Sequence, residues 1–245
     1  MTNVLTTATV DRTILGAASV HADTCSFTLS ALSPNQNLWD AIPRDIDTVR
    51  HYGQSEIATY CRHLVAQAEQ FSQQIRQLMH QHKLVVIDPI KQEVKGQKGR
   101  TNGLALRAAQ RFPFAPSDLV QKCLSFQMAV HDHALAAHKP VVEKKIVDAL
   151  MKRINTFWRN SDVRFGKTPI SFTDKLLFAT AATNAIMIEN GSQPYGNVVL
   201  VSRDFNHVFK MYHYREDLLR PVCNKYKLLY PRNFLFKPTF QAVPQ

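Results

Sequence analysis

The sequence has little cysteine, little glycine and no long apolar run. The 4 cysteines among 245 residues form no C-x-x-C pair, which argues against a zinc knuckle and against a disulfide framework. No segment reaches the roughly 18 uninterrupted apolar residues that a membrane-spanning helix requires. The early apolar run Ile14–Ala18 is too short for a secretory signal. We therefore expect a cytoplasmic protein with reduced thiols and no membrane partner.

The charge balance is strongly basic, with 30 Lys and Arg against 19 Asp and Glu, a net charge of +11. This excess favours a polyanionic partner such as nucleic acid, although basic proteins are also common for reasons of solubility alone. The densest basic stretch contains Lys91, Lys95, Lys98, Arg100, Arg107 and Arg111. We predict phosphate contacts at Lys95, Lys98 and Arg100, and a plain exposed face is the alternative.

Apolar runs alternate with segments of helical periodicity. Strands are expected at 13–28, 83–87 (KLVVI), 197–201 (NVVLV) and 226–230. Helices are expected at 47–80, from 90 onward, and at 116–137, 140–158 and 172–189, with Pro140 in a first turn and Thr173 as a cap. Continuously apolar strands are typical of a parallel sheet with helices on both faces.

The predicted fold class is therefore α/β, a Rossmann-like parallel sheet flanked by helices. We expect a single domain over 1–245. Its core would cover about 13–96 and 165–235, with a helical insertion at about 97–160.

Four acidic residues follow predicted strands or open predicted helices. Asp23 ends the first strand, Asp204 follows NVVLV, Glu93 lies about one helical turn after KLVVI, and Asp174 is in the first turn of its helix. Functional groups of an open parallel sheet gather beyond the carboxyl ends of its strands. Four carboxylates repel one another unless a cation lies between them, and hard oxygen ligands favour Mg²⁺ or Mn²⁺. The sequence thus predicts one metal site.

Each acid also has an ordinary structural interpretation. Asp23 and Asp204 are suited to strand-end turns, Asp174 to a first-turn helix charge, and Glu93 to a solvated helix face. Asp88 competes with Glu93 for the site, although the following proline favours a turn at Asp88.

Two clusters of ring-bearing residues also invite a functional interpretation. His131, His133 and His138 are close in sequence, but 131 and 133 point to different faces of a helix, which favours a packed or solvated cluster over a metal site. The segment 212–215 is suited to stacking on bases or to packing on the last strand.

Four segments, in this order, resemble the motifs of PIN-domain nucleases. VHADTC (20–25) is similar to the strand-end Asp-Thr-Asn of that family, and VVIDPIKQEV (85–94) to the strand and helix that present a glutamate. FTDKLLFATA (172–181) resembles the aspartate that opens an alanine-rich helix, and VVLVSRDF (198–205) the strand followed by Thr/Ser-x-Asp and an aromatic residue. Cys25 departs from the first motif, and the spacings are longer than in the compact PIN toxins.

The resemblance implies a PIN-like fold, one or two Mg²⁺ or Mn²⁺ ions, and hydrolysis of RNA phosphodiester bonds. It gives metal-binding and catalytic roles to Asp23, Glu93, Asp174 and Asp204. Thr24 and Ser202 would support the neighbouring carboxylates, and Arg203 is a further candidate contact to nucleic acid. Zn²⁺ is expected to be a poor substitute because the sequence shows no His/Cys ligand set.

Three alternatives stay open. A nuclease of the same fold would act on DNA, a toxin would have a protein inhibitor or antitoxin as partner, and an RNA-binding scaffold would have no catalysis. Four intact acids argue against the scaffold, because clustered negative charge adds nothing to the binding of nucleic acid.

Overall fold

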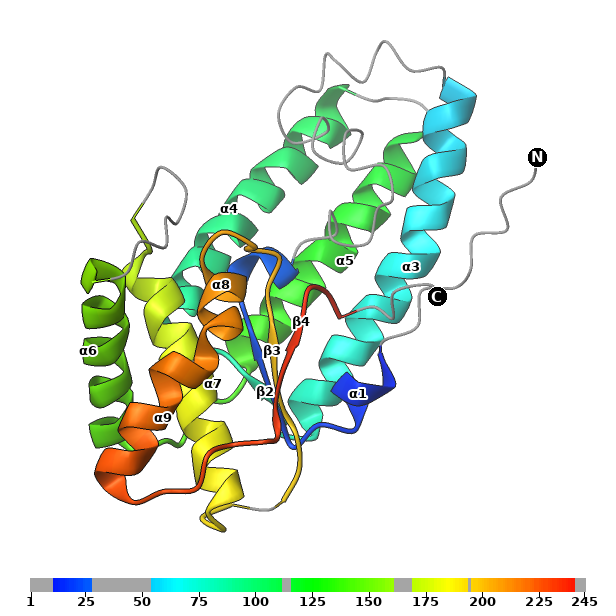
Figure 1. The fold of residues 1–245 in the computed structure, drawn as a ribbon. Helices are drawn as coiled ribbons and strands as arrows, with labels where there is room; N and C mark the ends of the chain where they lie inside the picture. Colours follow the sequence, from blue (N-terminus) through cyan, green and yellow to red (C-terminus); the bar gives the residue numbers. More distant parts are fainter. Residues whose placement is uncertain (1–10, 28–53, 112–115, 161–168, 194, 241–245) are drawn as a thin grey trace, which may run out of the picture.

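A parallel sheet of four strands lies at the centre of the computed structural model, which describes residues 11–27, 54–111, 116–160, 169–193 and 195–240 (Figure 1). The strand order is β2-β1-β3-β4. The strands are β1 (Ser19–Ala22), β2 (Leu84–Val85), β3 (Val198–Val201) and β4 (Phe234–Lys237). The predicted α/β class, with a parallel sheet flanked by helices, is confirmed.

Most residues of the strands are apolar, and the polar Ser19 and His21 of β1 are buried among them. Every residue of β1, β2 and β3 is buried. Val20 pairs with Leu84 of β2 and with Val199 of β3, and Val198 pairs with Phe234 of β4. From β1 the chain passes first to β2 on one side and later to β3 on the other. The order of connection therefore reverses between β1 and β3, which is where open α/β sheets bind ligands.

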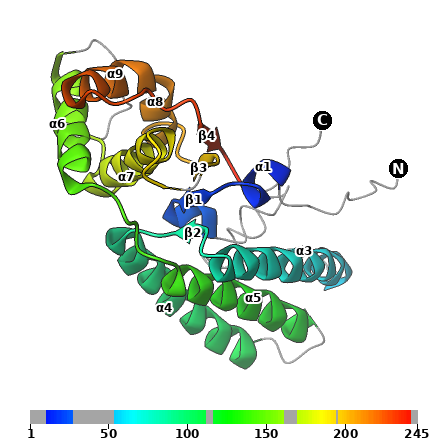
Figure 2. The same ribbon diagram turned by 90° about the horizontal axis from the view of Figure 1, so that it is seen from below.

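Helices cover both faces of the sheet (Figure 2). One face carries α3 (Gln54–His80), α4 (Asp88–Arg111) and α5 (Pro116–Ala136). The other carries α6 (Lys144–Asn160), α7 (Phe172–Glu189), α8 (Val208–His213) and α9 (Arg215–Tyr226). Helix α7 is buried along most of its length, and small side chains such as those of Ala182 and Ala185 allow it to pack closely against its neighbours. No helix of the described ranges is long and apolar enough to cross a membrane.

Several predicted boundaries were wrong near the start of the chain. Residues Arg12–Leu15 form a helical turn, α1, because the Asp11 carboxylate accepts a hydrogen bond from the Thr13 N–H at 2.8 Å. The first strand therefore begins only at Ser19, and a 3₁₀ turn, η1 (Thr24–Phe27), follows it. Of the helix expected at 47–80, residues 47–53 lie outside the described part.

Helix α4 begins at Asp88 and runs unbroken through the basic, glycine-containing stretch to Arg111. Asp88 is thus the first residue of a helix and not part of a turn. The start of the helical insertion, expected near residue 97, falls inside this helix. Helix α6, at the end of the expected insertion, packs on α7 and α9.

The remaining differences concern helix starts and the last strand. Helix α6 starts at Lys144 and not at Pro140, because the segment before it runs beside β2, where the His138 N–H bonds to the Leu84 carbonyl at 3.2 Å. Ser171, not Thr173, caps α7 by accepting the Asp174 N–H at 3.0 Å. The last strand is Phe234–Lys237 and not 226–230, because α9 continues to Tyr226.

Candidate metal centre

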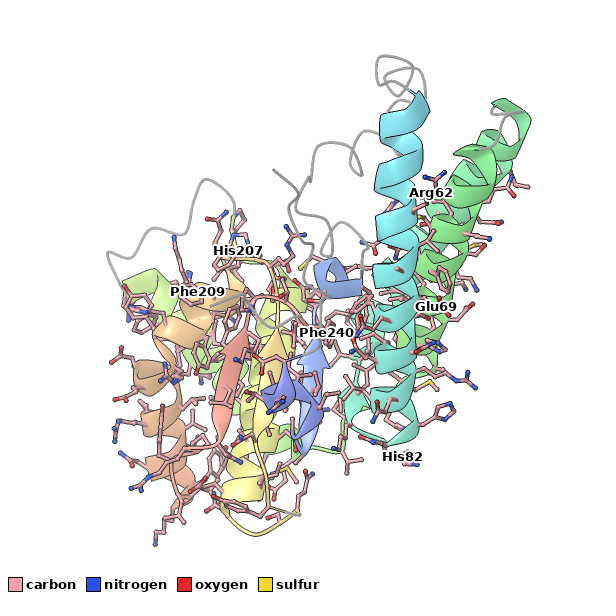
Figure 3. All side chains as sticks on the ribbon, turned by 90° about the vertical axis from the view of Figure 1, so that its right-hand side faces the viewer. Arg62, Glu69, His82, His207, Phe209 and Phe240 are labelled. Carbon is pink, nitrogen blue, oxygen red and sulfur yellow. The ribbon has the colours of Figure 1, made fainter. Side chains whose placement is uncertain are left out.

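The four predicted acids come from four separate segments at the carboxyl edge of the sheet. In the described residues only Asp174 and Asp204, with His207, offer donor atoms within 4.8 Å of one another, and Asp23 and Glu93 lie outside that group. Asp23 follows β1 directly, Asp204 follows β3, Glu93 is in the second turn of α4 and Asp174 is in the first turn of α7. In Figure 3, His207, which contacts two of these acids, lies at the end of the molecule opposite His82, which precedes β2. The site is therefore at the switch point between β1 and β3.

Asp23 is the most buried acid of the site, at 8% exposure. Its Oδ1 accepts the Thr24 N–H at 2.6 Å, and its Oδ2 accepts the Ser202 hydroxyl at 2.9 Å and the Cys25 thiol at 3.1 Å. Burial raises the pKa of Asp23, and the negative charge of Asp174 raises it further, whereas these hydrogen bonds lower it. The net shift is upward, so the charged form is disfavoured when no cation is present.

Glu93 joins helix α4 to the same site. Its Oε2 accepts the Thr24 hydroxyl at 2.5 Å, so a single residue of η1 contacts both Asp23 and Glu93. The competing acid, Asp88, is exposed and bonds to Lys139 at 3.0 Å. Of the two, Glu93 is the acid that contacts η1, next to Asp23.

Asp174 and Asp204 complete the site together with a histidine. Asp204 Oδ1 accepts the N–H groups of Asn206 at 2.8 Å and His207 at 2.9 Å, which fixes the turn after β3. The His207 Nδ1 lies 3.1 Å from Asp204 Oδ2 and 3.6 Å from Asp174 Oδ2. One donor atom from each of the three residues lies within 4.8 Å of the others. Burial and the negative charge of Asp204 raise the pKa of Asp174, although a bond to Ser171 and the charge of His207 oppose the rise.

His207 was not among the site residues predicted from the sequence. The available signal was its position three residues after Asp204, which allows both side chains to share one tight turn. With this imidazole the donor set contains carboxylate oxygens and one nitrogen. Carboxylates suit Mg²⁺ and Mn²⁺, and imidazole suits transition metals better than Mg²⁺. The residues present therefore fit a divalent cation and provide a nitrogen ligand that the sequence analysis did not expect.

The other histidines of interest belong to packing contacts. His131 is buried and bonds to Gln127 at 2.7 Å, and burial lowers its pKa to about 4. His138 contacts His82, with the ring centroids 4.2 Å apart. Neither histidine belongs to the group of possible metal ligands found in the described residues.

The predicted phosphate contacts differ in their surroundings. Lys95 and Arg100 are exposed on α4, whereas Lys98 pairs with Asp132 of α5. Arg203 lies inside the site's own loop, and its backbone N–H donates to the Cys25 sulfur at 3.3 Å. The side chains of Arg107 and Arg111 lie outside the described part. Lys95 and Arg100 thus remain the candidate phosphate contacts on α4 whose side chains are exposed.

Comparison with known proteins gives no match: no family model fits the chain, and no curated protein or solved structure is significantly similar to it.

Proposed function

We propose that this protein is a PIN-like, metal-dependent ribonuclease that holds Mg²⁺ or Mn²⁺ among Asp23, Glu93, Asp174 and Asp204. The observation that carries the proposal is the group of Asp174, Asp204 and His207 at the switch point of a parallel sheet, beside Asp23 and Glu93, which Thr24 joins to each other. Holding like charges close together costs stability unless a cation or protons neutralise them, and the cost is larger for a buried acid such as Asp23. A divalent cation accounts for the cluster with the donor types that are present.

The residues of the site divide into holding and orienting roles. Asp174, Asp204 and His207 offer three donor atoms close enough to bind one ion. A bound cation would activate water and neutralise charge that develops on the phosphodiester. Asp23 is held by three donors and is suited to a fixed ligand position. Glu93 is more exposed and is suited to orient the attacking water and to accept its proton.

The substrate assignment rests on charge. The net charge of +11 favours a polyanion. Lys95 and Arg100 lie on α4 with Glu93, and Arg203 precedes Asp204 in the loop after β3. Positive groups beside a carboxylate centre bind the phosphates that flank the reacting one and offset the repulsion between substrate and acids. RNA is the proposed substrate, and DNA is the alternative that the same charges allow.

The decisive experiment is incubation with end-labelled RNA and DNA of one sequence in Mn²⁺, Mg²⁺ or EDTA. The wild type should shorten RNA with either metal and leave it intact in EDTA, and Asp23→Asn should cleave nothing measurable. Asp88→Asn is the matched control, because Asp88 is an exposed acid of the same chain whose partner, Lys139, is outside the site.

The possible results separate the alternatives. Full cleavage in EDTA, or by the Asp23→Asn variant, would contradict the metal mechanism. Cleavage of DNA alone identifies a DNA nuclease. Binding of RNA by the wild type with no cleavage in either metal identifies a non-catalytic scaffold.

A further inference from the structure

A cavity of about 300 Å³ lies near the starts of helices α4, α6 and α7, where the segment from α5 to α6 runs beside β2 (Figure 2). Its volume is at the lower end of the range of ligand pockets, about 300–1,000 Å³. None of its lining residues belongs to the carboxylate site. Most of its wall is apolar and comes from Ile87, Pro89, Pro140, Val142, Val147 and Leu176.

The polar residues of the cavity differ between its interior and its rim. Thr180 is buried and is the one hydroxyl-bearing residue of the lining. The charged residues of the lining, Asp88, Lys139 and Lys144, are exposed. A nucleobase or a sugar needs several hydrogen-bonding partners, because its polar atoms lose their water when they are buried. One hydroxyl group cannot provide them, so the interior suits a hydrocarbon group.

The charge of the rim favours an anion. Lys139 bonds to Asp88 at 3.0 Å, whereas no carboxylate of the described residues pairs with Lys144. The next residue, Lys145, is outside the lining and pairs with Glu143 at 2.9 Å. The rim therefore has one uncompensated positive charge, at Lys144, and an anionic group can also compete with Asp88 for Lys139.

We propose that this cavity binds a small amphipathic carboxylate, with its hydrocarbon part among the apolar side chains and its carboxylate at Lys144 and Lys139. The inference does not depend on the proposed nuclease function. Burial of the hydrocarbon provides most of the affinity, and the lysines orient the molecule and select a negative head group. The volume of the cavity limits the occupant to a short chain or a single ring.

The test is a titration with octanoate, followed by calorimetry and by the amide NMR spectrum. All samples contain EDTA, so that no metal ion at the carboxylate site can bind the probe. Octanoate should bind saturably and shift the amide signals of Ile87, Val142 and Leu176. Octanol, which has the same chain without the charge, should bind more weakly, and octylamine, with a positive head group, more weakly still.

Two adjacent lysines provide a matched pair of variants for the head group. Lys144→Gln should weaken binding of octanoate about 2- to 5-fold and leave binding of octanol unchanged, because an exposed ion pair contributes little. Lys145→Gln, outside the lining, should bind octanoate as the wild type does. Asp88→Asn should tighten binding by a similar factor, since it removes the acid that competes for Lys139.

Two adjacent valines provide a matched pair for the interior. Val142 lines the cavity, so Val142→Trp should fill it and weaken binding of octanoate at least about tenfold. Val141 is 79% exposed and outside the lining, so Val141→Trp should leave the affinity unchanged. Thermal unfolding shows whether each variant is folded, and the lysine pair decides alone if Val142→Trp is not.

Three results would overturn the inference. The first is the absence of saturable octanoate binding, and the second is octanol or octylamine binding as tightly as octanoate. The third is binding that Lys144→Gln and a folded Val142→Trp both leave unchanged, because the probe would then lie elsewhere on the protein.

Discussion

Replacing Asp23 by asparagine removes one charge from the site and keeps the size of the side chain. The pKa of Asp23 is raised by burial and by the charge of Asp174, so the carboxylate is a cost to the metal-free fold. Against this gain, the Oδ2 position changes from acceptor to donor and loses its bonds from Ser202 and Cys25. One such bond contributes about 1 kcal/mol, and the Ser202 hydroxyl can turn to accept instead. Without metal, the free energy of unfolding of the variant should therefore lie within about 1 kcal/mol of the wild-type value.

The response to metal should separate the two proteins clearly. A ligand that binds only the native state at 100 times its Kd adds about 2.7 kcal/mol to the free energy of unfolding. For a chain of this size, 1 kcal/mol moves the Tm by about 2–4 °C. The wild type should thus gain about 5–10 °C in saturating Mn²⁺. The Asp23→Asn variant should gain less than about 2 °C at the same concentration, because it lacks one ligand.

The assay is thermal unfolding in EDTA and across a Mn²⁺ titration, with Asp88→Asn as control. The control should match the wild type in both conditions, since Asp88 is exposed and bonded to Lys139. One outcome would refute the reasoning. If Asp23→Asn loses more than about 3 kcal/mol in EDTA and keeps the full Mn²⁺ response, Asp23 is a structural cap of the strand end, since losses of that size signal a broken buried network.

Three further predictions concern protons, metal choice and salt. In EDTA, the free energy of unfolding of Asp23→Asn minus that of the wild type should be most positive near neutral pH, where the wild-type carboxylate is charged. This difference should fall as pH falls through the raised folded-state pKa of Asp23, and it should become constant below the unfolded value of about 3.9, which paired denaturant titrations measure. His207→Gln should weaken binding of Mn²⁺ about tenfold and of Mg²⁺ less, by calorimetry, because imidazole suits Mn²⁺ better; equal losses would contradict a nitrogen ligand. Lys95→Gln with Arg100→Gln should flatten the slope of log K against log salt by about 1.4 for single strands, and an unchanged slope would leave α4 outside the binding track.

The parts of the fold that could be predicted from the sequence are those whose signal is local. The run NVVLV is apolar at every position of β3, and a continuous apolar run of this length is typical of a strand buried on both faces. Helix α7 has the predicted bounds, Phe172–Glu189, because its alanine-rich and apolar sequence suits a helix buried against the sheet. The end of β3, and Asp204 after it, could therefore be predicted from the sequence.

The parts that failed depend on packing at a distance. Helix α4 passes through Gly96, Gly99 and Gly103, which lower helix propensity, yet it stays continuous while Ile90 and Val94 are buried in the core. The last strand was misplaced because 226–230 and 234–237 are both rich in apolar and aromatic residues. The end of α9 is marked by a left-handed residue that is a lysine and not a glycine, so no sequence signal shows it.

The choice between Asp88 and Glu93 was also undecidable from the sequence, for a geometric reason. Five residues of α-helix turn the side-chain direction by roughly 140°, so only one of the two acids can face the sheet edge. Which one does so depends on where α4 starts and on how it packs against η1. The contact between Thr24 and Glu93 reports that packing, and it exists only in the folded protein.

Two residues with hydroxyl groups connect three of the four acids, and the fourth, Asp174, lies beside His207. Ser202 donates to Asp23, 179 residues away, and accepts the N–H of Asp204, while Thr24 connects the backbone beside Asp23 to Glu93. Ser202 follows β3 directly, and Thr24 comes two residues after the end of β1. The pairing of β1 with β3 therefore sets the positions of the acids that these two residues bind. The carboxylates are then held in fixed positions, and the cost of bringing them together is their charge repulsion. A cation that enters it gains the electrostatic energy without a large cost of ordering the ligands, which is the physical advantage of building such a site on strands and helix termini rather than on a free loop.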